Sequence, residues 1–168
     1  MRVLETLHDA WRNDRVKILS ISAELHSQLA AAAKHQGGEI PGDVLERAVL
    51  TFRRSYDEVF GGFSAAPKFP MGHMLSFLLR CSTDAHDDEL LRMVEHTLLR
   101  MSRGGICDQI GGGFCRYSVD RRWLVPHFEK MLYDNALLLM AYTDAYQITG
   151  RAEYRTVAEE IIEYVRRE

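Results

Sequence analysis

The sequence predicts an all-α protein built from antiparallel helical hairpins. Apolar residues recur at helical spacing in about seven successive segments, and short connections join most of them. One long passage, from Gly104 to Asn135, breaks this periodicity and concentrates glycines and chemically active side chains. With 168 residues and a hydrophobic composition of 46%, the chain can bury a substantial core. We therefore expect a single domain over residues 1–168.

Two helices are expected in the first part of the chain. The first carries apolar residues at helical spacing up to Trp11, and Asn13 or Asp14 can cap the start of the second. The second helix is expected to end near Gly37 and Gly38. The other apolar positions of these two helices are Leu4, Leu7, Ile18, Ile21, Leu25 and Leu29.

The next two helices flank a loop. A helix from about Pro41 to Phe60 is expected, because proline suits a first helical turn and Gly61 follows the last one. The segment GGFSAAPKFP contains two glycines and two prolines, so it is expected to be irregular. A short helix from about Met71 to Cys81 is apolar on most sides, which indicates burial between neighbours.

Three further helices complete the pattern. One begins with acidic residues near Asp87 and ends with basic residues near Arg103, which suits the helix dipole, and Gly104 is placed to cap it. Helical periodicity returns from Phe128 to about Ile148 with apolar residues around nearly the whole circumference, so this helix should be enclosed. A final amphipathic helix keeps its apolar spacing up to the last residue, which indicates that the chain was cut between two helices.

Composition excludes several classes of function. A formal net charge of -3 with interspersed signs offers no basic face for DNA or RNA. No apolar run approaches the ~20 residues that cross a bilayer, and the charged first segment is unlike a secretory signal, so a cytoplasmic protein is expected. Cys81, Cys107 and Cys115 contain no CxxC pair. Cys107 and Cys115 are either two small loop thiols or a pair that meets across the glycines.

The irregular passage holds candidates for acid and base catalysis. His127 with Glu129, or Asp108 with Asp134, can supply the imidazole and carboxylates that proton transfer requires. In the structural alternative, Glu129 favours a helix N-terminus, Lys130 and Asp134 form an intrahelical ion pair, and His127 binds a loop carbonyl. Spacing alone leaves both readings open.

Neither a metal site nor a phosphate loop is expected in this passage. His127 and Glu129 are two residues apart and do not form an HExxH motif, and the GGG run lacks the GK[ST] of a phosphate-binding loop. No cofactor is expected. The aromatic residues Phe69, Tyr117 and Trp123 can stack on a sugar face or plug the end of a helical bundle. The segment RYSVDRRW is compatible with a short β-hairpin around Asp120.

Three segments carry a resemblance to a known family: AW-NDR near the start, GGFSAAPKFP, and GGICDQIGGGFCRYSVDRRWLVPHFEKMLYDNALL. They resemble the thioredoxin-domain-containing family that includes spermatogenesis-associated protein 20 and its bacterial counterparts. In that family a thioredoxin-like domain precedes a helical toroid similar to six-hairpin glycosidases and N-acylglucosamine 2-epimerases. The resemblance implies that this chain is the opening part of the α/α toroid, without the thioredoxin-like domain.

The resemblance also implies a carbohydrate site where the loops meet. Its candidate catalytic residues are Asp108, His127, Glu129 and Asp134. Its candidate substrate contacts are Lys68, Phe69, Gln109, Arg116, Tyr117 and Trp123. Many members of the family have histidine at the positions of Gln109 and Cys115, so epimerase chemistry that uses those histidines is less expected here.

The residues and the family resemblance together lead us to expect one of two functions. The first is sugar binding, or epimerase-like or glycosidase-like acid/base chemistry on a sugar by the full-length protein, with the isolated chain inactive. The alternative is a non-catalytic helical domain that docks a thioredoxin-like domain or a client protein. We also expect the chain to self-associate, because part of a toroid leaves the apolar flanks of its terminal helices uncovered.

Overall fold

A computed structural model describes residues 2–34 and 38–168 of the chain, which divides into two compact units, Met1–Pro41 and Gly42–Glu168. The first unit contains α1 (Arg2–Asn13) and α2 (Arg15–Ala33). Both helices were predicted, but α2 ends at Ala33, before the predicted end near Gly37 and Gly38, of which Gly37 lies outside the described residues. The guanidinium of Arg15 lies 4.8 Å from the centre of the Trp11 ring. The exposed apolar side chains of this unit include Leu4, Leu7, Ile21, Leu25 and Leu29.

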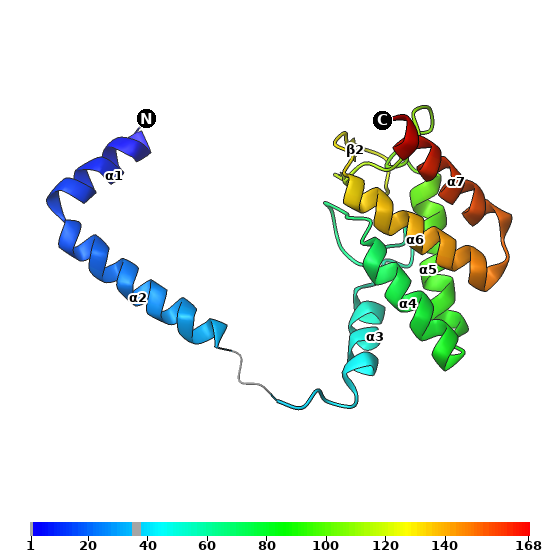
Figure 1. The fold of residues 1–168 in the computed structure, drawn as a ribbon, viewed down its shortest axis with the longest axis horizontal. Coiled ribbons are helices and arrows are strands. Elements are labelled where there is room, and N and C mark those ends of the chain that lie inside the picture. The colour runs from blue at the N-terminus through cyan, green and yellow to red at the C-terminus, as the bar shows by residue number, and fades with distance from the viewer. Residues whose placement is uncertain (1, 35–37) are drawn as a thin grey trace. The chain divides into compact units, whose positions relative to one another are not determined.

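The second unit is a set of packed helices with one loop-rich end, as the all-α prediction required. Its helices are α3 (Val44–Ser55), α4 (Gly72–Ala85), α5 (Asp88–Ser102), α6 (Leu132–Thr149) and α7 (Ala152–Arg167). Helix α4 packs against α5 and α6, and α6 packs against α7, so neighbours along the chain form hairpins (Figure 1). The irregular passage lies at the end of the unit where α6 begins.

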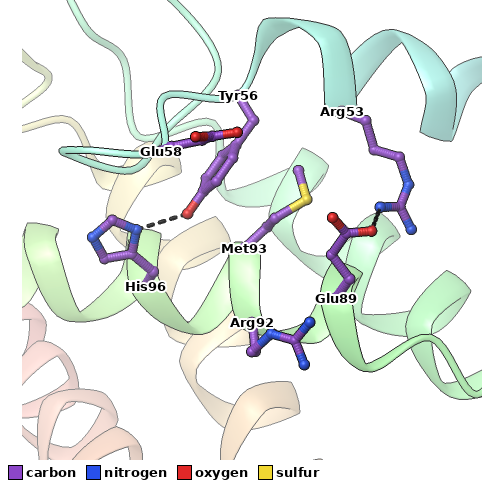
Figure 2. A pocket seen from close by; sticks show the side chains of 7 residues that line it. All are labelled: Arg53, Tyr56, Glu58, Glu89, Arg92, Met93 and His96. Carbon is purple, nitrogen blue, oxygen red and sulfur yellow. Dashed lines mark hydrogen bonds and ion pairs between the residues drawn. The ribbon is translucent and has the colours of Figure 1, made fainter.

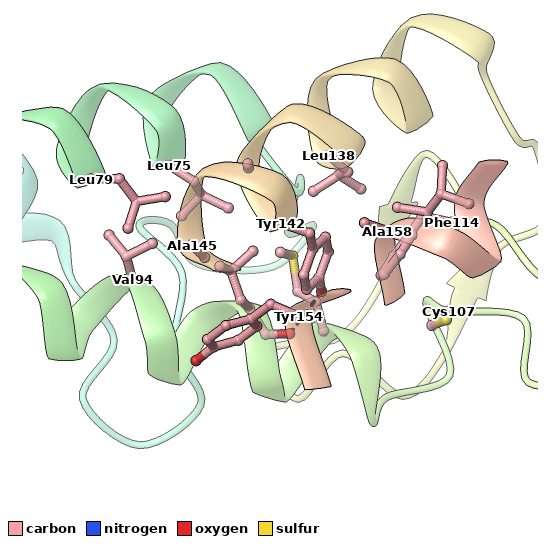
Figure 3. Close-up of a cluster of buried hydrophobic side chains, with 14 of the residues drawn as sticks. Leu75, Leu79, Val94, Cys107, Phe114, Leu138, Tyr142, Ala145, Tyr154 and Ala158 are labelled. Atoms are coloured by element: carbon pink, nitrogen blue, oxygen red, sulfur yellow. Dashed lines mark hydrogen bonds between the residues drawn. The ribbon is translucent and has the colours of Figure 1, made fainter. Parts of the chain in front are cut away.

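Apolar side chains from α4, α5, α6 and α7 form one core (Figure 3). Tyr142 of α6 is fully buried in it, and its hydroxyl donates a 2.8 Å hydrogen bond to the carbonyl of Leu98 in α5. Its ring stacks on Phe114 from the irregular passage, with the ring centres 5.7 Å apart. The irregular passage is therefore anchored in the helical core.

Two helix boundaries differ from the prediction near the loop after α3. Helix α3 ends at Ser55 instead of Phe60, because the carboxylate of Asp57 accepts hydrogen bonds from the amides of Val59 and Phe60, each 3.1 Å long, and closes a turn. Helix α4 continues to Ala85, beyond the predicted end at Cys81.

Helix α6 begins at Leu132, four residues later than the prediction that started it at Phe128. The amide of Arg116 donates a 2.7 Å hydrogen bond to the carbonyl of Glu129, and the ammonium of Lys130 binds Asp108 at 2.7 Å. These contacts hold residues 128–131 away from helical geometry. The alternative in which Lys130 and Asp134 form an intrahelical ion pair is therefore wrong.

A two-stranded antiparallel sheet lies within the irregular passage, and its hairpin was predicted, although the second strand lies beyond the predicted segment RYSVDRRW. Strand β1 (Tyr117–Ser118) pairs with β2 (Pro126–His127), with Tyr117 opposite His127. The carboxylate of Asp120 organises the connection, because it accepts hydrogen bonds from the amides of Arg122 and Val125, each 2.5 Å long.

Glycine allows this hairpin to approach the end of α5. A Cβ atom at Gly105 would lie 2.1 Å from the carbonyl oxygen of Leu124, and one at Gly104 would lie 2.5 Å from that of Trp123. At both positions the neighbouring backbone excludes any side chain, so only glycine fits. Gly104 is thus required for close approach, while Arg103 occupies the C-cap position of α5.

Among the described residues, no helix combines the length and apolar character needed to cross a membrane.

Candidate functional site

A buried lysine fixes the position of the loop that enters the site. The backbone of Lys68 pairs with that of Ser118 through two hydrogen bonds of 2.7 and 2.8 Å, which adds one residue pair to the β1–β2 hairpin. The Lys68 ammonium donates to the carboxylate of Asp57 at 2.7 Å and to the carbonyls of Gly61 and Arg121. All three ammonium protons are therefore used inside the protein.

This arrangement corrects the expected role of Lys68 as a substrate contact. Its side chain is 0% exposed, so it cannot reach a ligand in this structure. Arg121 adds two hydrogen bonds to Asp57, of 2.7 and 2.9 Å. Together with the two backbone amides, these cations hold the pKa of Asp57 well below its usual range, although burial acts in the opposite direction.

Trp123 is also unavailable to a sugar. It is fully buried, and its indole nitrogen donates a 2.8 Å hydrogen bond to the carbonyl of Phe60. The Lys68 ammonium lies 5.2 Å from the centre of its ring. Trp123 therefore packs within the buried core at the base of the hairpin.

Asp108 and Gln109 form a separate group at the glycine run. The Asp108 carboxylate accepts hydrogen bonds from Lys130 and from the amides of Ile110 and Gly111, and these contacts hold its pKa well below the usual range. Such a carboxylate is a poor general acid at neutral pH. The side-chain nitrogen of Gln109 donates to the carbonyl of Ser102 at the end of α5 and to the loop carbonyls of Gly104 and Cys107. Both side chains thus stabilise the loop, and they lie apart from the other candidates.

The remaining candidates converge on one exposed surface. The bridge at Lys68 places Phe69 beside Tyr117, and the strand register places His127 directly opposite Tyr117. The ring centres of Phe69 and Tyr117 lie 4.9 Å apart, and those of Tyr117 and His127 lie 4.6 Å apart with planes inclined by 20°. We call the three residues Phe69, Tyr117 and His127 the ring stack.

The ring stack is open to solvent. Phe69 is 40% exposed and the His127 side chain is 46% exposed. Two exposed rings on a rigid backbone provide a flat apolar surface beside polar atoms, which suits the face of a sugar ring.

Charged groups lie against the ring stack. The Glu129 carboxylate accepts a 3.1 Å hydrogen bond from Arg116 and lies 4.0 Å from Nδ1 of His127. Asp134, in the first turn of α6, also lies within the electrostatic reach of Arg116 and Glu129. One oxygen of Asp134 is buried without a hydrogen-bond partner among the described residues. Burial raises the pKa of Asp134, so its protonated form persists to higher pH than usual.

This surface combines an imidazole, two carboxylates in different environments and a guanidinium. A carboxyl group whose pKa is raised by burial, as that of Asp134 is, can act as a general acid. Of the ten predicted site residues, the structure thus brings together Phe69, Arg116, Tyr117, His127 and Glu129. It places Asp134 within electrostatic reach of Arg116 and Glu129, and it places the other four elsewhere. The described residues contain no group of three or more His, Cys, Asp or Glu placed to hold a metal ion. All three cysteines are free thiols.

Sequence reasoning missed two residues that build the site. Asp57 anchors Lys68 and Arg121, but the helical periodicity around it predicted an ordinary helix position. Asn135 is fully buried, and its amide group both accepts from and donates to the backbone of Phe114, at 2.7 and 3.0 Å. A buried amide at the start of a largely apolar helix was the available signal for this second residue.

Known proteins resemble the chain in sequence and in fold. The chain is 40% identical over 176 aligned residues to human spermatogenesis-associated protein 20, an alignment that covers 98% of this chain and 22% of that protein. The chain thus spans about a fifth of the length of the curated relatives it matches. An uncharacterised protein of Caenorhabditis elegans is 32% identical over 171 residues. The chain matches no protein-family profile.

Solved structures show the same helical architecture. Cellobiose 2-epimerase from Spirochaeta thermophila matches with a TM-score of 0.65 and 18% identity, over 86% of this chain and 36% of that one. Cellobiose 2-epimerase from Bacillus thermoamylovorans matches with a TM-score of 0.62 and 16% identity, over 68% of this chain and 32% of that one. The fold is therefore that of the α/α toroid, as the family resemblance implied.

Proposed function

This chain is a homologue of spermatogenesis-associated protein 20 with an α/α-toroid fold, and from that premise we propose that its ring stack binds carbohydrate. The observation that carries the proposal is the exposed stack of Phe69, Tyr117 and His127 beside the Arg116–Glu129 ion pair. Sugars present a flat C–H face and a rim of hydroxyl groups. The rings suit the face, and the guanidinium and carboxylate suit the hydroxyls.

The proposed acid/base roles follow from the charges around the stack. His127, with Glu129 at 4.0 Å from its Nδ1 atom, is the candidate base. Asp134, whose pKa is raised by burial, is the candidate acid. An epimerisation beside a sugar carbonyl breaks a C–H bond, leaves the electron pair in an enediolate, and returns a proton to the opposite face of the same carbon. A base and an acid near one sugar are the groups that this reaction requires.

The solved neighbours guide the choice of sugar. Two of them are cellobiose 2-epimerases, so cellobiose is the first ligand to test. Binding is the appropriate readout for this chain, because we expect the isolated chain to be inactive. The activity itself is proposed for the full-length protein.

The test is calorimetric titration of the chain with cellobiose. Tyr117→Ala removes the central ring of the stack, and we expect it to weaken binding about threefold to tenfold, the range of aromatic pair energies. Glu129→Gln keeps the side-chain shape and removes its charge, so it should weaken binding as well.

Glu159→Gln is the matched control for the charge change. Glu159 also forms an ion pair with an arginine, Arg155, but it lies on the exposed side of α7. The affinity of this variant should equal that of the unmodified chain. Wild-type affinity in both Tyr117→Ala and Glu129→Gln would refute the proposal.

A further inference from the structure

A small arginine-lined pocket lies at the end of α5, on residues that the ring stack does not use. Its volume is about 200 Å³, and its polar lining consists of His96, Arg100, Arg103 and Arg122. The residues that line it include no aspartate or glutamate. It is smaller than the ~300–1,000 Å³ typical of drug-sized ligands, so it fits a small group.

The arginines come together for two reasons. His96, Arg100 and Arg103 are spaced four and three residues apart, so they share one face of the last turns of α5. Arg122 belongs to the turn of the β1–β2 hairpin, which the glycines at 104 and 105 allow to approach α5 closely. The pocket is therefore a junction of two rigid elements.

Two of these arginines have no acidic partner among the described residues. The guanidiniums of Arg100 and Arg122 lie 5.3 and 5.9 Å from the centre of the Phe60 ring and form no ion pair there. The Nε atom of Arg100 is buried and has no hydrogen-bond partner within the described part of the chain. A buried donor without a partner is costly, so Arg100 gains from an acceptor in the pocket, which its Nε atom reaches only after a shift of the side chain.

Two acids near the pocket, Glu153 and Asp57, are already paired. Arg103 contacts Glu153 at 3.3 Å on the surface. The nearby carboxylate of Asp57 is held by Lys68 and Arg121. The charges of Arg100 and Arg122 are thus left for a ligand.

His96 lines this pocket and also a second, larger one. The larger pocket has a volume of about 450 Å³ and lies between α3 and α5 (Figure 2). There, the hydroxyl of Tyr56 lies 2.7 Å from Nδ1 of His96. Burial and the charge of Arg100 lower the pKa of His96, so the ring is neutral at pH 7. When the phenol donates to Nδ1, the single ring proton lies on Nε2 and can serve as a hydrogen-bond donor.

We propose that the pocket formed by His96, Arg100, Arg103 and Arg122 binds the phosphate group of a small molecule. Phosphate offers several acceptor oxygens, and the planar guanidinium fork binds two of them at once. The C-terminal end of α5 carries a partial negative charge, so side chains and not backbone amides hold the group. The inference is independent of the proposed carbohydrate function, because the two surfaces share no residue.

The test is an NMR titration of the full chain at constant ionic strength. Inorganic phosphate and glycerol 3-phosphate are the two probes, and the reported signal is the side-chain Nε–H of Arg100. Both probes should shift this signal with saturation. Equal affinities assign the pocket to the phosphate group alone, and tighter binding of glycerol 3-phosphate assigns it to a phosphate ester.

Variants separate the pocket from general surface charge. Arg122→Gln removes an exposed guanidinium, and we expect it to weaken phosphate binding about tenfold to a hundredfold, the value of a charge-assisted hydrogen bond. Arg155→Gln removes an exposed arginine of α7 and should leave the affinity within about twofold. Failure of both probes to move the Arg100 signal beyond a chloride control would overturn the proposal, as would wild-type affinity in Arg122→Gln.

Discussion

Asp57→Asn tests the anchor that positions the hairpin and, through it, the ring stack. The carboxylate accepts hydrogen bonds from Lys68, from Arg121 and from two backbone amides. Asparagine has nearly the same shape but lacks the charge, and one of its two oxygens is replaced by an NH₂ group. The substitution therefore leaves the Lys68 ammonium buried and uncompensated.

The magnitude depends on which cation loses its partner. Lys68 is 0% exposed, and breaking a buried pair by removing one partner costs about 3–5 kcal/mol. Arg121 is 56% exposed, so water can replace its partner at a cost below about 1 kcal/mol. We therefore expect a loss of about 3–5 kcal/mol, a large share of the ~5–15 kcal/mol of a typical domain.

Urea unfolding followed by Trp123 fluorescence measures this loss in a Trp11→Phe background, where Trp123 is the remaining tryptophan. Asp84→Asn, on the exposed side of α4, is the matched control and should change stability by less than about 0.5 kcal/mol. A loss below about 1 kcal/mol in Asp57→Asn would refute the assignment of Asp57 as the anchor.

The same pair of proteins gives a pH test. The folded-state pKa of Asp57 lies below its unfolded value of about 3.9, so its contribution is fully present above about pH 5 and is lost as pH falls further. The stability difference between the unmodified chain and the Asp57→Asn variant should therefore narrow below about pH 4. A difference that stays constant down to about pH 2.5 would contradict the ion-pair explanation, because the carboxylate has lost part of its contribution by then.

Three further substitutions test the packing around the site. Asn135→Leu leaves the buried amide and carbonyl of Phe114 unpaired, so we expect a loss of at least about 2 kcal/mol by urea unfolding and faster hydrogen exchange of the Phe114 amide. Gly105→Ala places a Cβ atom 2.1 Å from the carbonyl oxygen of Leu124, so it should destabilise by more than about 2 kcal/mol in the same assay. Asp134→Asn removes a partly buried carboxylate whose pKa is raised, so thermal unfolding should show higher stability at pH 7 and no gain at pH 3.

Each of these predictions has a control or a contrary outcome. Gly150→Ala is the control for Gly105, because a Cβ at Gly150 meets no atom within 4 Å, and only the cost of its left-handed backbone, about 1 kcal/mol, remains. Slow exchange of the Phe114 amide in Asn135→Leu would show that another group satisfies it. Equal stabilities of the Asp134→Asn variant and the unmodified chain at pH 7 would remove the evidence for a strained carboxylate.

Local pattern was sufficient to locate the helices of the described residues and the hairpin, but not the end of α3, the end of α4 or the start of α6. The apolar spacing of α5 and the acidic and basic residues at its ends predicted that helix closely, because both signals lie within the helix itself. The turn residue Asp120 likewise indicated the hairpin, since it contacts backbone amides only two to five residues away.

The site could not be predicted in the same way, because distant partners decide its geometry. The apolar spacing of α6 predicts a helical residue at Lys130. Its ammonium instead binds Asp108, 22 residues earlier, and the helix starts after Lys130. Lys68 lies in a glycine- and proline-rich loop typical of an exposed position, yet Asp57 draws it into the interior. Long-range ion pairs overrode local propensity at both positions.

NMR of the aromatic side chains during a cellobiose titration tests the central claim most directly. If the ring stack binds carbohydrate, the ring signals of Tyr117 and His127 shift together and saturate, while the ring signals of Trp11 do not move. Shifts confined to other residues, or no saturable shift at either ring, would contradict the claim that this surface holds a sugar.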